Sequence, residues 1–271
     1  MKILRLCVSV LFVLVLIVFI LFRIQQMSAD RTVPKITIDG EMLTVSLDAT
    51  EEELLQGVTA YDEKDGDLTH KIIIESISRF SEPGVSVIKY AVCDNDNHAS
   101  SAQRKIIYSN YEPPKFTLSD SLIFGISQNI NIRNLLGAQD LIDGDISSKV
   151  IITANEYSSN VAGVFYIQAK VANSKGDRIA LQLPVYVEDL SLSAPKIELN
   201  EYLVYLHAGD TYDTAANIVS ARNAQGQNVL ADVQIDTNLD TAAPGMYEVH
   251  YRVTDQFDRT GHEILTVVVE E

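Results

Sequence analysis

The chain has 271 residues, of which 37 are acidic and 21 are basic, so its formal net charge is −16 at pH 7. An acidic surface of this size repels polyanions, which argues against nucleic acid or an anionic lipid surface as a partner. The two cysteines, Cys7 and Cys93, are too few for a disulfide framework, so the fold must be held together by packing.

The N-terminal segment predicts a membrane anchor. Leu6 to Phe22 is a run of seventeen residues without a charge, and a helix of that length approaches the roughly 30 Å of a hydrocarbon core. Lys2 and Arg5 outweigh Arg23, which places the N-terminus in the cytoplasm. The alternative is a cleaved signal peptide, whose apolar part usually covers about 7–15 residues before a small-residue cleavage site. The sequence QQMSA behind the run is a poor site of that kind, so we expect residues 1–30 to form a cytoplasmic stub and an uncleaved single-pass anchor, with the C-terminus extracellular.

The rest of the chain is a threefold repeat. Three segments open on a proline followed by lysine and an apolar residue, with spacings of 80 and 81 residues, at Pro34, Pro114 and Pro195. Each segment closes on a glycine and then a run that alternates between apolar and polar residues, which is the period of a strand with one buried face. These runs begin at Gly84, Gly163 and Gly245. A fixed period indicates an array of similar modules, and we expect three domains, at 31–110, 111–191 and 192–271.

Within each repeat the pattern predicts an antiparallel β-sandwich. Roughly seven short strands follow one another with turn residues about every 8–12 positions, as in an immunoglobulin-like sandwich. In the first repeat Thr50 and Glu53 form a capping-box sequence, which predicts a short helix that ends before Gly57. The expected fold class is therefore all-β, with three tandem Ig-like antiparallel β-sandwiches after an N-terminal transmembrane helix.

One motif with the composition of a metal site occurs in the first two repeats. The pattern Ala-x-Asp-x-x-Asp-Gly-Asp-x-Ser/Thr recurs 78 residues further on, and three carboxylates around a glycine offer oxygens of the kind that calcium prefers. The same residues suit a turn, because aspartate side chains accept hydrogen bonds from nearby backbone N–H groups and glycine adopts a positive φ. The spacing differs from that of an EF-hand loop, and the third repeat has no carboxylate in the corresponding stretch 221–227.

Both interpretations, structural turn and cation site, stay open at this point. Calcium is the only cofactor that the sequence suggests, and it would need further oxygens because it takes 6–8 ligands. The residue after each long alternating strand is the expected extra donor. The candidate calcium ligands are Asp62, Asp65, Asp67 and Asp94 in the first repeat and Asp140, Asp143 and Asp145 in the second, where Asn173 takes the place of Asp94.

The acidic motif and the strand that follows it resemble the bacterial Ig-like repeat of surface and secreted proteins. The resemblance rests on the turn at 62–67 and on Tyr90, Val92 and Asp94, and it covers residues 33–271. That family is related to the Ig-like modules attached to an insecticidal crystal toxin and is similar in layout to hyaline-type repeats. The second repeat departs from the pattern at Ala169 and at Asn173, and the third lacks the acidic turn. The resemblance implies an Ig-like sandwich that serves as a spacer or binding module, with no catalytic residues to carry over.

Catalysis has little support in the sequence. The five histidines are scattered over the repeats, and His98 and His250 are expected at the surface. No Gly-x-Ser-x-Gly elbow, phosphate-binding glycine loop or Cys/His pair occurs. We therefore expect a protein that is not an enzyme.

Two functions from different classes remain. The first is a binding or adhesion module at the bacterial cell surface, in contact with a cell-surface or cell-wall protein or glycan. The second is a passive spacer or an accessory subunit of a surface or secretion complex, rigidified by calcium. The third repeat has three tyrosines within eleven residues, which favours binding because exposed aromatic side chains concentrate at binding surfaces. These are Tyr202, Tyr205 and Tyr212, and because Tyr202 and Tyr205 face opposite sides of a strand, we expect at least one of them in the core.

Overall fold

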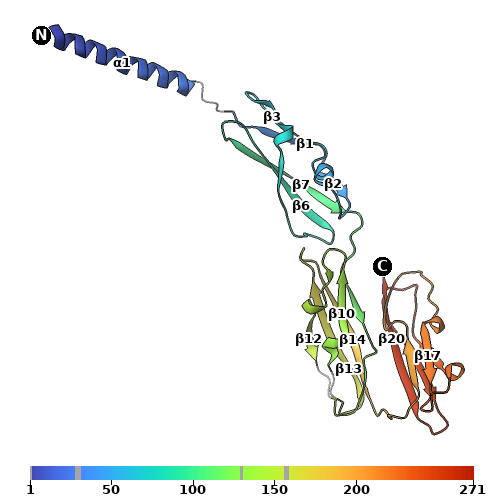
Figure 1. Ribbon diagram of the computed structural model, residues 1–271. Coiled ribbons are helices and arrows are strands. Elements are labelled where there is room, and N and C mark those ends of the chain that lie inside the picture. The colour runs from blue at the N-terminus through green and yellow to red at the C-terminus, as the bar shows by residue number, and fades with distance from the viewer. Residues whose placement is uncertain (1, 28–31, 129–130, 156–158) are drawn as a thin grey trace. The chain divides into compact units, whose positions relative to one another are not determined.

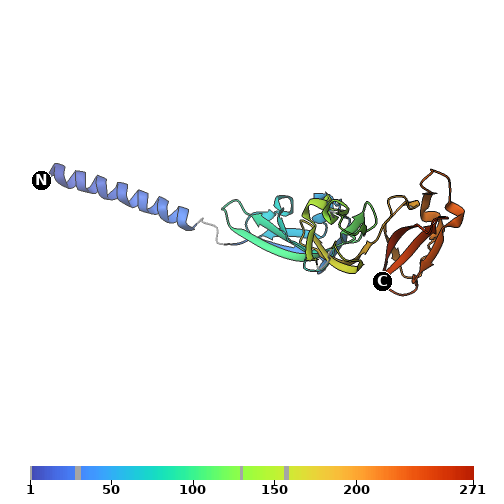
Figure 2. The ribbon, with the colours of Figure 1, turned by 90° about the horizontal axis from the view of Figure 1, so that it is seen from below.

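The computed structural model describes residues 2–27, 32–128, 131–155 and 159–271. These form two compact units, Met1–Asn110 and Tyr111–Glu271, of which the first contains one repeat and the second contains two. Helix α1 (Lys2–Met27) is a single continuous helix at the start of the first unit (Figures 1 and 2). Among the described residues, no helix combines the length and the hydropathy that a membrane span requires.

The first repeat is built from two sheets. Three strands are hydrogen-bonded in the order β1–β3–β4 and four in the order β2–β7–β6–β5. The short helix α2 (Glu51–Leu54) begins with the predicted capping box, in which the Thr50 side chain accepts the N–H of Glu53 and the Glu53 carboxylate accepts the N–H of Thr50. The strands are β1 (Lys35–Ile38), β2 (Met42–Val45), β3 (Val58–Asp62), β4 (Gly66–Asp67), β5 (Ile73–Ile77), β6 (Val85–Cys93) and β7 (Ala99–Tyr108).

The second and third repeats follow the same plan. In the second, the sheets have the orders β11–β10–β8 and β12–β13–β14–β9, and in the third β15–β17 and β16–β20–β19–β18. The strands of the second repeat are β8 (Lys115–Leu118), β9 (Ile123–Gly125), β10 (Leu136–Asp140), β11 (Gly144–Asp145), β12 (Ile151–Asn155), β13 (Gly163–Ala172) and β14 (Arg178–Glu188). Those of the third are β15 (Lys196–Leu199), β16 (Leu203–His207), β17 (Ile218–Arg222), β18 (Gln234–Thr237), β19 (Gly245–Thr254) and β20 (Thr260–Glu270).

Each repeat contains a pair of parallel strands. This differs from the prediction of a purely antiparallel sandwich. The parallel pairs are β2 with β7, β9 with β14 and β16 with β20. They arise because the first segment of a repeat is split between its two sheets: β1 pairs with β3, and the chain then crosses to the other sheet, where β2 runs beside the last strand. Gly40 lies in this crossing with a φ of 80°, a left-handed conformation that glycine adopts without steric cost.

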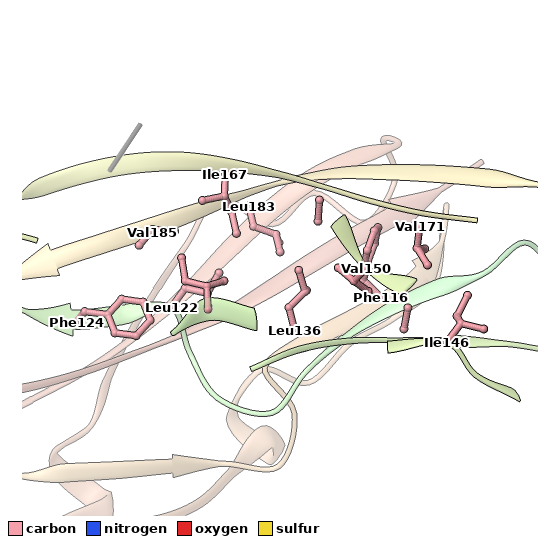
Figure 3. Packing of buried hydrophobic residues seen from close by; sticks show 13 residues of the cluster. Phe116, Leu122, Phe124, Leu136, Ile146, Val150, Ile167, Val171, Leu183 and Val185 are labelled. Carbon is pink, nitrogen blue, oxygen red and sulfur yellow. The ribbon is translucent and has the colours of Figure 1, made fainter. Parts of the chain in front are cut away.

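The alternating strands β6, β13 and β19 direct one set of side chains into the core, as the period of two predicts. Figure 3 shows this in the second repeat, where Ile167 and Leu183 point from β13 and β14 toward Phe116 and Leu136. Each repeat has its own cluster of buried apolar side chains, and burying one such side chain stabilises a fold by about 1.5–3 kcal/mol. The inward positions are Ile88, Tyr90 and Val92, then Ile167, Ala169 and Val171, and finally Val249, Tyr251 and Val253, all of them buried.

Candidate functional site

The first residue of each acidic motif closes a turn by accepting backbone hydrogen bonds. Asp62 Oδ1 accepts the N–H of Lys64 at 2.9 Å and that of Asp65 at 3.0 Å. Asp140 Oδ1 accepts the N–H groups at the same two offsets, both at 2.9 Å. In the third repeat Asn223 takes this place, and its Oδ1 accepts the N–H two residues further on at 3.1 Å. Because a neutral amide closes the same turn, this position requires an acceptor rather than a charge.

The last aspartate of each motif caps the segment that follows. Asp67 Oδ1 accepts the N–H of Thr69, and Asp145 Oδ1 that of Ser147, both at 2.9 Å. The hydrogen bonds from Thr69 lower the pKa of Asp67, and those from Ser147 lower the pKa of Asp145. Both carboxylates therefore have a structural partner within two residues.

The middle aspartate ties the turn to the hairpin that follows the long strand of the repeat. Asp65 Oδ2 accepts the N–H of Asn95 at 2.8 Å. Asp143 Oδ2 accepts the N–H of Ser174 at 2.8 Å and a hydrogen bond from Lys149 Nζ at 2.7 Å. Lys149 and Ser174 lower the pKa of Asp143. The motif thus joins two segments that lie about thirty residues apart in the sequence.

The two acidic turns differ at the residue that follows the long strand. In the second repeat Asn173 Nδ2 donates a hydrogen bond to Asp140 Oδ2 at 3.0 Å. The first repeat has Asp94 at this place, and a carboxylate has no N–H to donate. Asp94 accepts the backbone N–H of His98 at 2.7 Å and lies 2.8 Å from the Nδ1 atom of that ring. The Oδ2 atom of Asp62 is consequently buried without a hydrogen-bond partner.

Hydrogen bonds within the protein occupy most of the carboxylate oxygens that were candidate calcium ligands. In the part of the chain that the structure describes, no group of three or more His, Cys, Asp or Glu side chains is arranged to hold a metal ion. The geometry therefore supports the turn, while calcium binding at these seven aspartates stays a prediction that calorimetry and unfolding experiments can test.

We expect about 1 mM calcium to leave thermal unfolding of the full chain unchanged, and Asp140→Ala to destabilise the second repeat by about 2 kcal/mol in chelator. Alanine removes the acceptor of two backbone N–H groups and one of the two acceptors of the buried Asn173 amide, which also donates to the Tyr111 hydroxyl. Asp140→Asn is the matched comparison, because it keeps the turn acceptor that Asn223 provides in the third repeat but places an NH₂ group opposite that of Asn173, so it should lose less stability than alanine without matching the wild type. A calcium-dependent rise in melting temperature that Asp62→Asn and Asp140→Asn abolish would identify these residues as calcium ligands.

The outer face of the large sheet in the second repeat carries two cations near one end of its long strands, while the carboxylate on these strands, Glu188, lies at the other end of β14. The outward residues of β13 and β14 face each other in pairs, from Val164 opposite Tyr186 to Ala172 opposite Arg178. None of these outward positions holds Asp or Glu, although the chain has 37 acidic residues. Lys170 and Arg178 lie on this face, and both are exposed.

A groove of about 590 Å³ lies at the Arg178 end of this face. Its lining includes Lys149, Lys170 and Arg178 around a floor of Ile151 and two alanines, and Ile151 is 58% exposed although it is apolar. Lys149 is paired with Asp143 at 2.7 Å, whereas among the described residues neither Lys170 nor Arg178 makes a side-chain ion pair. We call this feature, defined by Lys149, Ile151, Lys170, Ala172, Arg178 and Ala180, the cationic groove.

The combination of cations in the groove is specific to the second repeat. At the register positions of Lys170 and Arg178 the first repeat has Ala91 and Ala99. The third repeat has Thr260 in place of Arg178. Sequence reasoning missed this site because its cations come from separate strands. Only the pairing of β12, β13 and β14 brings them together.

The three tyrosines of the third repeat, which favoured a binding function over a spacer, are packing residues. Tyr202 and Tyr212 pack against the core of that repeat. Tyr205 accepts the N–H of Phe116 at 3.0 Å, and Lys115 Nζ lies 5.7 Å from the centre of its ring. Burial raises the pKa of Tyr205 to about 12. These side chains stabilise the third repeat and its contact with the second.

Comparison with known proteins agrees with the resemblance seen in the sequence. Residues 198–269 match a family model described as bacterial surface protein, Ig-like domain. The chain is 29% identical over 260 residues to pesticidal crystal protein Cry22Aa of Bacillus thuringiensis, covering 92% of this chain and 35% of that protein. An uncharacterized 81.3 kDa protein of Acholeplasma phage L2 is 27% identical over 138 residues, 49% of this chain and 18% of that protein. The match confirms the resemblance to bacterial Ig-like surface domains over residues 198–269, and the chain spans about a third or less of these two relatives.

Solved structures match only loosely. The M60 catalytic domain with two CBM51 domains of Clostridium perfringens ZmpB has 13% identity and a TM-score of 0.24, with 87% of this chain and 30% of that chain covered. Drosophila N-cadherin EC1-4 has 12% identity and a TM-score of 0.24, with coverages of 90% and 76%. Overlap this poor carries no functional argument, so the function must be argued from the chain's own surface.

Proposed function

We propose that this chain is a non-catalytic, membrane-anchored module at the bacterial cell surface that binds an acidic glycan in the cationic groove of its second repeat. The observation that carries the proposal is the Arg178 end of the outer face of β13 and β14, where Lys170 and Arg178 are exposed and the paired outward positions hold no carboxylate, on a chain of net charge −16. A local cationic patch attracts anions even on an acidic protein, because charges further away than about 8 Å are screened at physiological ionic strength.

The chemistry of the groove favours a polymer that has both an anionic group and an apolar face. An arginine guanidinium binds a carboxylate or a phosphate through two parallel hydrogen bonds, and a lysine ammonium adds a point charge. The exposed Ile151 and Ala180 provide an apolar floor between these head groups, on which the C–H face of a sugar ring can lie. Carboxylate and phosphate glycans share this chemistry, and the experiment distinguishes them.

The proposed anchor rests on the uncharged run from Leu6 to Phe22. This run lies within the single helix α1, and its large apolar side chains from Val8 to Phe22 are exposed along it. Apolar side chains on every face of a helix are typical of a helix that lipid surrounds. The excess of Lys2 and Arg5 over Arg23 favours a cytoplasmic N-terminus, which would place all three repeats outside the cell.

We expect Lys170→Ala with Arg178→Ala to weaken binding of an acidic polymer by at least tenfold at physiological salt. Two charge-assisted contacts are lost, and each is worth about 1.5–3 kcal/mol when well formed. The measurement is titration of the full chain in detergent with polygalacturonate and, in parallel, with poly(glycerol phosphate), beside neutral dextran. The two substitutions introduce the alanines that the first repeat has at the same register positions, so the fold should be kept.

Lys89→Ala is the matched control, because Lys89 lies on the corresponding face of the first repeat but is paired with Glu75 at 3.1 Å. It is expected to leave binding unchanged. If the wild-type chain binds neither acidic polymer, the spacer function replaces the binding function. The anchor is tested separately on intact bacterial cells that make the full chain with a C-terminal tag. Added protease should cleave the tag, and the protein should stay in the membrane after an alkaline carbonate wash.

A further inference from the structure

Several acid–base side chains meet where the third repeat packs against the second. His262 Nδ1 lies 2.9 Å from Glu188 Oε1, and His262 Nε2 lies 3.0 Å from His250 Nδ1. The other ring nitrogen of His250 is 3.4 Å from Glu248 Oε2. Figure 1 shows β14, which carries Glu188, and β20, which carries His262, in the two repeats of the second unit. We call the pair of imidazoles the histidine pair.

The histidine pair is enclosed, although the sequence predicts His250 at the surface. The side chain of His262 is 3% exposed and that of His250 is 16% exposed. His250 does point away from the core of its own repeat, as its position in β19 predicts, but the second repeat covers that face. The ring of Tyr186 in β14 stands edge-on to both imidazoles, with centroid distances of 5.8 and 6.1 Å.

The charged groups around the histidine pair come from both repeats. Hydrogen bonds with His262 and His250 lower the pKa of Glu188 and Glu248 respectively, so both are carboxylates at neutral pH. Tyr186 donates its hydroxyl hydrogen to Glu248 Oε2 at 2.8 Å, and the pKa of this phenol is raised by burial and by Glu248. The guanidinium of Arg252 lies 3.4 Å from His250 Nδ1, and Asp236 of β18 stands opposite His250 in the sheet but is exposed to water.

Counting protons shows which protonation state fits this geometry. Each outer ring nitrogen faces a carboxylate and therefore carries a hydrogen, as imidazoles held by carboxylates do. The two inner nitrogens face each other at 3.0 Å, a distance at which one hydrogen fits between them and two repel. With one inner hydrogen the pair has a single positive charge, which together with Arg252 balances Glu188 and Glu248.

We infer that one shared proton on the histidine pair holds the second and third repeats together, and that a second proton separates them in mildly acidic surroundings. The second proton puts two N–H groups head to head at 3.0 Å and leaves an uncompensated positive charge in an enclosed site. Separation removes both penalties, because the imidazoles then face water. The contact between the repeats therefore works as a pH-sensitive latch, and it is independent of the glycan proposal.

The sign of the pH dependence follows from proton binding in the two states. An imidazole in water titrates near pH 6.5. Below that pH both imidazoles of the open state are positively charged, whereas the pair in the closed state carries a single positive charge. The open state thus binds more protons, and closure weakens as the pH falls. Acidification to about pH 5 should populate the open state, whereas the closed state should dominate between pH 7 and 8.

Glu263 of the third repeat acts in the opposite direction at the same contact. Its carboxylate accepts a hydrogen bond from the Ser121 hydroxyl of the second repeat, and burial raises its pKa to about 7. A raised carboxyl pKa means that the closed state binds this proton more tightly, so closure due to Glu263 strengthens as the pH falls from 7 toward 4.5. An experiment on the histidine pair must therefore include the variant Glu263→Gln, whose side chain does not titrate.

The test measures the distance between the two repeats as a function of pH. Spin labels are attached to cysteines at the exposed positions Ser148 and Gln225 in the full chain in detergent, with Cys7 and Cys93 changed to serine. We expect the opened fraction to rise about sixfold between pH 7 and pH 5 in Glu263→Gln, and by less in the wild type, where Glu263 opposes the opening. In His250→Gln, which cannot take the second proton, this rise should be absent.

Two outcomes would overturn the inference. One is a distance that stays constant down to pH 5 in Glu263→Gln, and the other is equal opening in His250→Gln. As a check that needs no variant of the pair, ¹⁵N-histidine spectra of the wild type at pH 7 should show three nitrogen-bound hydrogens on His250 and His262, and four would refute the shared proton. A change of distance on adding zinc chloride at pH 7.5 would assign the pair to a metal instead.

Discussion

Replacing Arg104 by alanine is expected to lower the free energy of unfolding of the first repeat by about 3 kcal/mol. Arg104 is only 5% exposed, and its guanidinium donates hydrogen bonds to the Tyr90 hydroxyl at 2.8 Å and to the carbonyls of Leu54 and Gln56 at 3.0 and 2.7 Å. Hydrogen bonds from a charged donor contribute about 1.5–3 kcal/mol, and truncation of a buried side chain leaves a cavity that adds to this loss.

The guanidinium also connects the end of helix α2 to the large sheet through hydrogen bonds. Leu54 is the last residue of the helix, and Arg104 lies in β7, about fifty residues further along the chain. Its guanidinium carbon lies 5.5 Å from the centre of the Tyr90 ring, so the aromatic ring and the helix end share one cation. Without it, the carbonyl of Gln56 loses this hydrogen bond.

Chemical unfolding of the full chain in detergent measures the effect, and the second and third repeats provide an internal reference. Lys105→Ala is the matched control because Lys105 is the exposed neighbour on the opposite face of the same strand. Arg104→Leu should recover part of the loss, since Leu183 and Leu265 occupy this place in the other repeats. Equal stability of Arg104→Ala and Lys105→Ala would show that the buried guanidinium adds nothing.

Patterns of local origin could be predicted from the sequence. The inward faces of β6, β13 and β19 follow from alternation alone, because successive side chains of a strand point to opposite sides. The turn function of Asp62 and Asp140 is local as well, since each accepts hydrogen bonds from residues two and three positions ahead. The capping box at Thr50 is of the same kind.

Features that depend on which strands become neighbours could not be predicted in this way. The parallel pairing of β2 with β7 leaves no signal in either strand, because alternation is the same in both directions. Arg104 is a charged residue at an inward position of β7. Nothing in the sequence around it predicts that two carbonyls about fifty residues earlier accept its hydrogen bonds. His250 was correctly placed on the outward face, but the packing of a second repeat onto that face buries it.

Changing Gly261 to alanine is expected to destabilise the third repeat by about 3 kcal/mol. A Cβ atom at this position would lie 2.0 Å from the carbonyl oxygen and 2.8 Å from the carbonyl carbon of Pro195. These are backbone atoms of the segment that leads into β15, so a side-chain rotation cannot relieve the clash. Overpacking typically costs about 1–3 kcal/mol when neighbours can shift, and a backbone clash this close places the cost at the upper end. Thermal unfolding of the full chain measures it.

Gly163→Ala in β13 is the matched control for Gly261→Ala. Its added Cβ would lie 3.6 Å from the ring of Phe165, which is an ordinary contact distance, so this change should leave stability unchanged or raise it by up to about 0.5–1 kcal/mol, because alanine loses less backbone freedom than glycine in a strand. Gly261→Ala should also weaken the contact between the second and third repeats. Gly261 precedes His262 in β20, and Pro195 belongs to the connection between these repeats. A shift of β20 away from Pro195 displaces His262 from Glu188, so the repeats of Gly261→Ala should separate already at pH 7. A variant that unfolds like the wild type and stays closed at pH 7 would mean that this close approach of strand and connection does not constrain the third repeat.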